Sequence, residues 1–140
     1  MEEAFYIDAN VFIFGALDKQ ELGEKAGIFL QASIDKGIRI YTSALTFDEF
    51  SYKVLRNKPI EDAIKSITAF LSLTNLTFLS VSKVTIWLAF ELIKKYHIDP
   101  RDAIHLACAV QNNIKTIISE DKDFDKVKEI KRISLDKIKL

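Results

Sequence analysis

The sequence predicts an α/β protein in which strands and helices alternate around a parallel sheet. Short apolar runs over residues 4–7, 38–41, 77–81 and 115–119 have the length and composition of buried strands. Longer segments with apolar residues at helical spacing lie between them, so the chain alternates strand and helix. Because crossovers between parallel strands are right-handed, we expect a central parallel sheet of four to five strands, the fifth being an edge strand over residues 132–135.

The composition fits one globular domain that spans residues 1–140. Of the 140 residues, 49% are hydrophobic, and 20 basic side chains balance 20 acidic ones, so no overall basic field indicates nucleic acid. The single cysteine, Cys108, excludes a disulfide framework and a zinc set. No apolar run has the length of a membrane span, and the Met-Glu-Glu-Ala start lacks the basic residues of a signal peptide, so we expect a cytoplasmic protein with no membrane partner.

Several helical segments precede the most informative one. A helix with an apolar stripe over residues 22–33 should end at Gly37, and its Gly23 and Gly27 suggest close packing on another element. A second helix opens near Thr46, and Pro59 starts a third, which gives an αα-hairpin suited to dimerisation or to a partner. A further helix over residues 84–96 contains the only tryptophan, Trp87, which we expect in the core.

The most informative helix begins at Asp99, a good N-cap, with Pro100 in the first turn. The helix is apolar almost all the way round from residue 103 to 110, as in a helix packed inside a domain. Asp102 and His105 lie three residues apart on one face. An acid at the mouth of a buried helix must be capped, paired or bound to a cation, and a capping box between Asp99 and Asp102 is the structural alternative.

Other acids follow predicted strands. Asp8 comes directly after the first strand, where an N-cap or an Asx-turn is its structural alternative. Glu49 lies three residues after Thr46, which matches a capping box. Asp121, Asp123 and Asp125 alternate after the fourth strand, but the glycine and closing glutamate of a calcium loop are missing, so we reject that interpretation.

The topology brings four of these acids toward one edge of the sheet: Asp8, Glu49, Asp102 and Asp121. Four close carboxylates cannot all stay ionised unaided, because each raises the pKa of the others. A hard divalent cation such as Mg²⁺ or Mn²⁺ solves this problem, and it could activate water for phosphodiester hydrolysis. Lys53 and Arg56 share a helix face with Glu49, so they are candidate RNA-binding residues.

Four motifs in this order resemble the PIN-domain ribonucleases, especially the toxins of VapBC-type toxin-antitoxin pairs. They are Asp8-Ala-Asn10, Thr46-Phe-Asp-Glu49, the segment from Asp102 to Ala109, and Ser119-Glu-Asp121-Lys-Asp-Phe124. The resemblance spans nearly the whole chain. It implies a three-layer α/β/α fold, a Mg²⁺- or Mn²⁺-dependent endoribonuclease acting on single-stranded or loop RNA, a cognate antitoxin and frequent homodimers.

The same resemblance assigns the site. Asp8, Glu49, Asp102 and Asp121 would be the catalytic, metal-binding acids, with Asn10 and Ser119 as supporting polar groups. Ser119 stands where the family often has threonine, which keeps the hydroxyl. Asp123 competes with Asp121 for the fourth place, and we prefer Asp121 because it lies nearer the strand end. We expect His105 to support the site or pack in the core rather than to catalyse.

Other classes fit less well. A haloacid-dehalogenase-type phosphatase usually has a second aspartate two residues after the first, where this chain has Asn10. A phosphoreceiver needs paired acids after the first strand and a phosphoacceptor after a central strand, and neither is visible. Two alternatives within the same fold remain: an RNA-processing nuclease outside toxin-antitoxin systems, and a non-catalytic interaction module.

Overall fold

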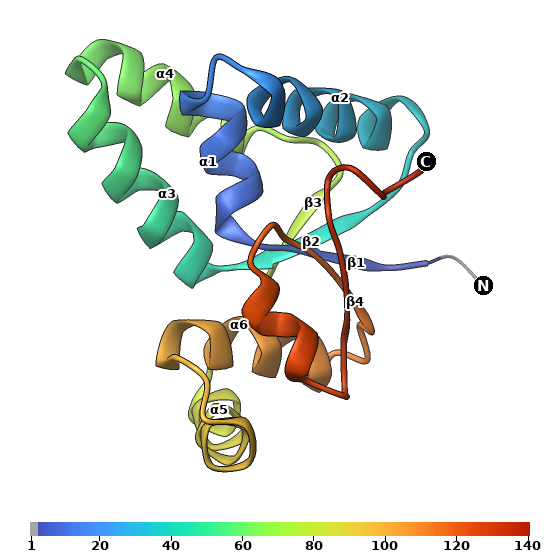
Figure 1. Cartoon of the computed structure of the whole chain (residues 1–140). Coiled ribbons are helices and arrows are strands. Elements are labelled where there is room, and N and C mark those ends of the chain that lie inside the picture. The colour runs from blue at the N-terminus through green and yellow to red at the C-terminus, as the bar shows by residue number, and fades with distance from the viewer. Residues whose placement is uncertain (1–2) are drawn as a thin grey trace.

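Five short strands form one parallel sheet in the computed structural model, which describes residues 3–140 (Figure 1). The strands lie in the spatial order β3-β2-β1-β4-β5, and each neighbouring pair is parallel. The prediction of a parallel sheet of four to five strands is confirmed. The strands are β1 (Phe5–Ile7), β2 (Ile40–Ser43), β3 (Leu76–Leu79), β4 (Thr116–Ile118) and β5 (Lys131–Ile133).

Helices cover both faces of this sheet, which gives three layers (Figure 1). Alternate residues of β1 point to opposite faces, as the pleat of a strand requires. Phe5 and Ile7 pack into one core with the first four helices, whereas Tyr6 packs into the other core with the last two. The helices are α1 (Ala9–Leu17), α2 (Glu21–Asp35), α3 (Ala44–Asn57), α4 (Ile60–Leu71), α5 (Lys83–Tyr96) and α6 (Pro100–Gln111), and a 3₁₀ helix, η1 (Lys122–Lys126), follows β4.

Helix α6 begins as the sequence predicts. Asp99 is the N-cap, and its side chain accepts a hydrogen bond from the Arg101 N–H at 3.0 Å, with Pro100 at the first helical position. The segment from Ala103 to Ala109 is buried except for Ile104, which is partly buried. Burial on nearly all sides fixes the helix against both α5 and the sheet, so its first turn is held firmly beside the strand ends.

Two glycines of α2 behave differently from each other. A Cβ on Gly23 would meet the carbonyl oxygen of Asp18 at 1.8 Å, so the close packing expected there is confirmed. The space around Gly27 is open to a Cβ, so the same expectation is wrong for that residue. Gly37 follows the end of α2 with φ +66, the left-handed conformation that glycine adopts without strain, which confirms the predicted helix end.

Trp87 corrects another expectation, because its side chain is 58% exposed rather than part of the core. Helix α5 packs against α6 through a different stripe, formed by Thr85, Ala89 and Leu92. Trp87 lies outside that stripe, and among the aromatic rings of the described residues it pairs only with Phe90, in a T-shaped arrangement. Among the helices of residues 3–140, none combines the length and apolar character needed to cross a bilayer.

Candidate active site

The carboxyl ends of β1 and β4 form the centre of the candidate site. These strands are neighbours, and the connections that leave β1 and enter β4 lie on opposite faces of the sheet. Crevices at such switch points are the usual ligand sites of open α/β sheets. Asp8 follows β1 and Ser119 follows β4, and the Asp8 N–H donates to the Ile118 carbonyl at 3.0 Å. Backbone pairing therefore fixes both side chains at the same crevice.

The Ser119 hydroxyl connects several polar groups of this crevice. It donates to Asp8 Oδ2 at 2.6 Å and accepts from Asn10 Nδ2 at 3.2 Å and from the Asp121 N–H at 3.0 Å. Asn10 Oδ1 is buried and has no hydrogen-bond partner in the described part of the chain. Of the two polar groups expected to support the site, Ser119 contacts Asp8 and Asp121 directly, and Asn10 contacts Ser119.

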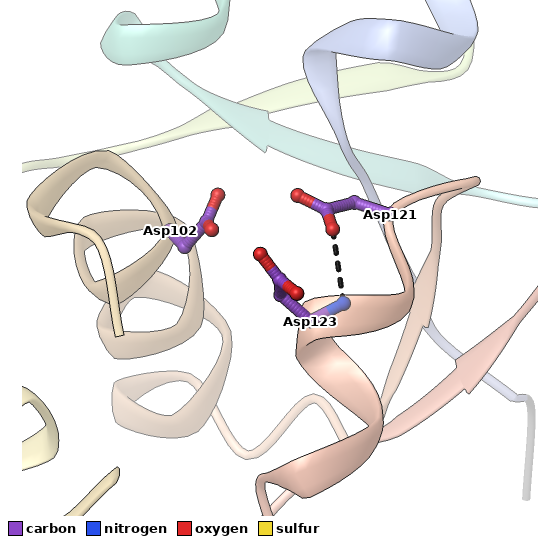
Figure 2. Close-up of side chains that lie close together, drawn as sticks. All are labelled: Asp102, Asp121 and Asp123. Carbon is purple, nitrogen blue, oxygen red and sulfur yellow. Dashed lines mark hydrogen bonds between the residues drawn. The ribbon is translucent and has the colours of Figure 1, made fainter. Parts of the chain in front are cut away.

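Three carboxylates gather on the other side of the crevice. Asp102 from the first turn of α6 and Asp121 and Asp123 from the start of η1 each place an oxygen within 4.8 Å of the others. Figure 2 shows these side chains pointing toward one another from the two elements. Asp121 also accepts a hydrogen bond from the Asp123 N–H at 2.9 Å, which fixes the turn between them. The structure therefore brings together both candidates for the fourth acid.

This gathering changes the acidity of Asp102. Desolvation is the largest cause, followed by the negative charges of Asp121 and Asp8, and together they raise the pKa of Asp102 to about 7. Burial also raises the pKa of Asp8, against the opposing effects of His105 and the Ser119 hydrogen bond. Because the charge of Asp8 contributes to the raised pKa of Asp102, the two sides of the crevice are electrostatically coupled.

Glu49 reaches the crevice from α3 through His105. Its Oε1 lies 2.6 Å from His105 Nε2, and the same nitrogen is 3.7 Å from Asp8 Oδ1. The hydrogen bond to Glu49 and the charge of Asp8 raise the pKa of His105, against the opposing effect of its burial. His105 is buried, and its ring contacts Glu49 as well as packing in the core. The structure places Glu49 beside Asp8 but outside the group around Asp102.

Across the residues that it describes, the structure contains neither of the capping boxes that were the alternatives for Glu49 and Asp102. Helix α3 begins at Ala44 rather than near Thr46, and the Thr46 hydroxyl accepts from Thr42 Oγ1 at 2.6 Å, so Glu49 takes part in no capping box there. Asp8 occupies the N-cap position of α1, yet within residues 3–140 its side chain makes no capping hydrogen bond. At α6 the capping bond comes from Asp99, which leaves Asp102 free to face the crevice.

The basic candidates on α3 have other surroundings. The Arg56 guanidinium donates to the Tyr52 hydroxyl at 3.0 Å and lies 5.2 Å from the centre of that ring. No ion pair between Glu49 and Lys53 is found in the described part of the chain, because Glu49 pairs with His105 instead. Asp125, third in the acidic run, forms a two-point ion pair with Arg132 at 2.8 and 3.1 Å, which lowers its pKa.

Sequence reasoning missed the role of Tyr6. Its hydroxyl lies 2.7 Å from His105 Nδ1 and 2.9 Å from Ser43 Oγ, and all three groups are buried. A signal was available, since Tyr6 is the one polar side chain in an otherwise apolar first strand. Its partner could not be named in advance, because that depends on which face of the sheet α6 covers.

The fold and the crevice together define an α/β protein with an acid-lined site at its switch point. The family model for the PIN domain matches residues 5–130. The chain therefore belongs to the PIN-domain family, which is a family of nucleases. No curated protein matches the sequence closely enough to count as a relative.

Solved structures of toxin-antitoxin proteins share this fold. The VapBC2 complex of Rickettsia felis, bound to promoter DNA, gives a TM-score of 0.76 at 17% identity, covering 94% of this chain and 98% of that one. The VapC20 toxin of Mycobacterium tuberculosis, described as cleaving the sarcin-ricin loop, gives a TM-score of 0.73 at 18% identity, covering 89% of this chain and 95% of that one. The DNA-bound VapBC of Salmonella typhimurium gives a TM-score of 0.73 at 18% identity, covering 96% of this chain and 99% of that one. At these identities the likeness establishes the fold.

Proposed function

We propose that this PIN domain is a Mg²⁺- or Mn²⁺-dependent endoribonuclease that cleaves single-stranded or loop RNA. The observation that carries the proposal is the meeting of Asp102, Asp121 and Asp123 within 4.8 Å, beside a buried Asp8 that shares their electrostatic field. Strongly shifted carboxyl groups in a crevice are typical of functional sites. A purely structural group of acids would be expected to have basic partners, as Asp125 has in Arg132.

The donor set fits a hard divalent cation. Every candidate ligand is a carboxylate, which is the oxygen donor that Mg²⁺ and Mn²⁺ prefer. Asp102, Asp121 and Asp123 would hold the ion, with Asp8 and Glu49 completing the site from the other side of the crevice. When bound, such an ion supplies activation of water and stabilisation of negative charge on phosphate oxygens.

The chain's own residues orient this chemistry. Ser119 holds the Asp8 carboxylate, Asn10 holds the Ser119 hydroxyl, and His105 holds Glu49. Cys108, the only thiol, is buried and its pKa is raised by burial, so it stays protonated and is not a nucleophile. In the proposed reaction water would be the attacking group, and hydrolysis would need no covalent intermediate on the protein.

The decisive experiment is cleavage of a single-stranded RNA by the purified chain. We expect products with Mg²⁺ or Mn²⁺ and none with excess chelator, because the carboxylates alone repel a phosphate. Returning the metal should restore cleavage, which controls for damage by the chelator. The same sequence annealed into a duplex should be cut more slowly. Equal cleavage in chelator would contradict the proposal.

RNA binding must use local basic groups, because the chain has no net charge. We propose Lys53 and Arg56, which share a helix face with Glu49. Replacing both by glutamine should weaken RNA binding and flatten its salt dependence by roughly one unit of slope per lost phosphate contact. The matched control is Lys36 and Lys139, which line a cavity at the opposite, amino end of β1. An unchanged slope in the Lys53 and Arg56 variant, measured by fluorescence anisotropy, would exclude them.

The partners we propose are a cognate antitoxin and a second copy of the chain. The VapBC structures described above are complexes of a toxin with its antitoxin, which supports the first. For the second, the hairpin of α3 and α4 exposes several apolar side chains, and exposed apolar surface of this kind is a candidate protein interface. These side chains are Tyr52, Leu55, Ile60, Ile64 and Leu71. An adjacent reading frame for a small DNA-binding protein would separate a toxin from an RNA-processing nuclease of the same fold.

A further inference from the structure

A line of hydrogen-bonded polar groups runs through the core from β2 to the crevice. Ser43 Oγ lies 2.9 Å from the Tyr6 hydroxyl, which lies 2.7 Å from His105 Nδ1, and Nε2 of the same ring lies 2.6 Å from Glu49 Oε1. Ser43, Tyr6 and His105 are at most 1% exposed, whereas Glu49 reaches the rim of the crevice. We call these four residues the Ser43–Glu49 hydrogen-bond network.

The chemistry of the groups fixes the orientation of the imidazole. An ionised carboxylate only accepts hydrogen bonds, so His105 Nε2 carries the hydrogen toward Glu49. Nδ1 is then engaged by the Tyr6 hydroxyl. A rotation of the ring would leave a buried polar atom without a partner at one end or the other, and buried unpaired groups are costly. The ring is therefore held from both sides.

The consequence for Glu49 is a fixed carboxylate. A glutamate on a helix surface normally samples several rotamers, and confining it has an entropic cost. Here the hydrogen bond from Nε2 retains Oε1 at 2.6 Å, and Asp8 Oδ1 lies 3.7 Å from the same nitrogen. One imidazole thus sets the spacing between the acid that follows β1 and the acid of α3. Core packing alone would not require a polar ring with both nitrogens engaged.

We propose that His105 is a positioning residue, held by Tyr6, which Ser43 holds in turn. His105 fixes Glu49 against Asp8, and so completes the proposed metal site on the side opposite Asp102, Asp121 and Asp123. The inference rests on the proposed nuclease function. Ligand carboxylates of metal sites are commonly held by outer hydrogen-bond partners, whose loss costs about 10- to 100-fold in affinity or activity. Tyr6 is the informative test, because its hydroxyl contacts His105 and Ser43 and none of the acids among the described residues.

The variants separate positioning from packing. Tyr6→Phe removes one oxygen, and Tyr41→Phe is its matched control, since Tyr41 pairs in register with Tyr6 on the neighbouring strand. Within the described residues, no side-chain hydrogen bond involves the Tyr41 hydroxyl. His105→Leu removes the donor to Glu49, whereas His105→Gln retains an amide donor near the position of Nε2. Thermal melting confirms that each variant is folded, and if His105→Leu does not fold, Tyr6→Phe and His105→Gln decide the question.

Nuclear magnetic resonance of the metal-free protein tests the Ser43–Glu49 hydrogen-bond network directly, through the exchange rate of the His105 ring proton. The sequence has two histidines, and His97 is exposed, so a slowly exchanging imidazole proton belongs to His105. We expect this Nε2 proton in the wild type and in Tyr41→Phe, and much faster exchange in Tyr6→Phe. A proton that exchanges equally fast in the wild type and Tyr6→Phe would overturn the fixed orientation.

Cleavage kinetics test the consequence. We expect Tyr6→Phe and His105→Leu to lower kcat by about 10- to 100-fold, with KM for RNA little changed, and His105→Gln to regain most of the rate. Adding His105→Leu to Glu49→Ala should cause no further loss, because both changes remove the same interaction. Wild-type rates in folded Tyr6→Phe and His105→Leu, or losses that add fully, would overturn the positioning role while leaving the nuclease proposal standing. A wild type that does not cleave RNA would instead overturn the function itself, and the inference with it.

Discussion

Asparagine in place of Asp102 is expected to abolish metal-dependent RNA cleavage, and so is asparagine in place of Asp8. The amide keeps the shape of the side chain but removes the negative charge that a divalent cation requires. Since losing an outer partner of a metal ligand alone costs about 10- to 100-fold, losing a ligand should cost about 100-fold or more. The measurement is the single-turnover cleavage rate of a labelled single-stranded RNA at saturating Mn²⁺.

Asp48→Asn supplies the matched control for this comparison. Asp48 is the neighbour of Glu49 on α3, but its side chain is exposed. The control should cleave at the wild-type rate. Asp121→Asn and Asp123→Asn in the same assay rank the two remaining acids beside Asp102. Undiminished cleavage by either Asp8→Asn or Asp102→Asn would show that the metal-binding assignment is wrong.

The fold was largely predictable because its signals are local. Apolar runs and helical stripes mark the elements, and alternation along the chain indicates a parallel sheet. Asp99 and Pro100 predicted the start of α6 correctly, since capping depends on neighbours in sequence. Strand ends were less certain, and β2 begins at Ile40 rather than at residue 38. The first residues of the predicted strand instead follow the end of α2, where the Ile38 N–H donates to the Ser33 carbonyl.

The part of the site that lies directly after the ends of strands was predictable. Asp8, Ser119 and Asp121 come together because β1 and β4 are neighbours in a parallel sheet, and the sequence order of elements implies that edge. The contacts between Tyr6, His105 and Glu49 depend on the depth and rotation of α3 and α6. These are set by packing across the whole domain, so spacing in the sequence cannot supply them.

Two expectations failed for the same physical reason. Thr46 followed by Glu49 matches a capping box, yet α3 starts earlier and buries Thr46 against Thr42. Trp87 has the composition of a core residue, yet α5 presents a stripe of smaller residues to α6. In each case a local pattern offered two arrangements, and tertiary packing selected the one that the pattern did not favour.

The metal-free protein should become less stable as the pH rises from about 4 to 7. A carboxyl group has a pKa of about 3.9 when unfolded, and that of Asp102 in the folded chain is about 7. Between these values the folded state retains a proton that the unfolded state has lost, so the free energy of unfolding falls with rising pH. The raised pKa of His105 acts in the same direction, since its stabilisation is present at low pH and lost as the pH rises through the folded pKa.

Asp102→Asn should therefore melt higher than the wild type at pH 8 in chelator, with the difference closing toward pH 5. After allowance for solvent screening the effect is on the order of 1 kcal/mol, or roughly 4 °C. An Asp102 that only stabilises its helix predicts the opposite sign. Its replacement would lose the favourable interaction with the helix dipole, about 0.3–1 kcal/mol. Scanning calorimetry across this pH range distinguishes the two.

Thermal melting with and without metal tests the central claim, that these acids form a cation site. An ion that binds only the folded state stabilises it by about 2.7 kcal/mol at a hundred times its dissociation constant. We predict that saturating Mn²⁺ raises the Tm of the wild type and of Asp48→Asn, and that Asp102→Asn loses most of this rise. The order of stability at pH 8 would then reverse between chelator and metal. If Asp102→Asn melts lower than the wild type in chelator and both respond equally to Mn²⁺, Asp102 is a structural residue of α6 and the proposed site is wrong.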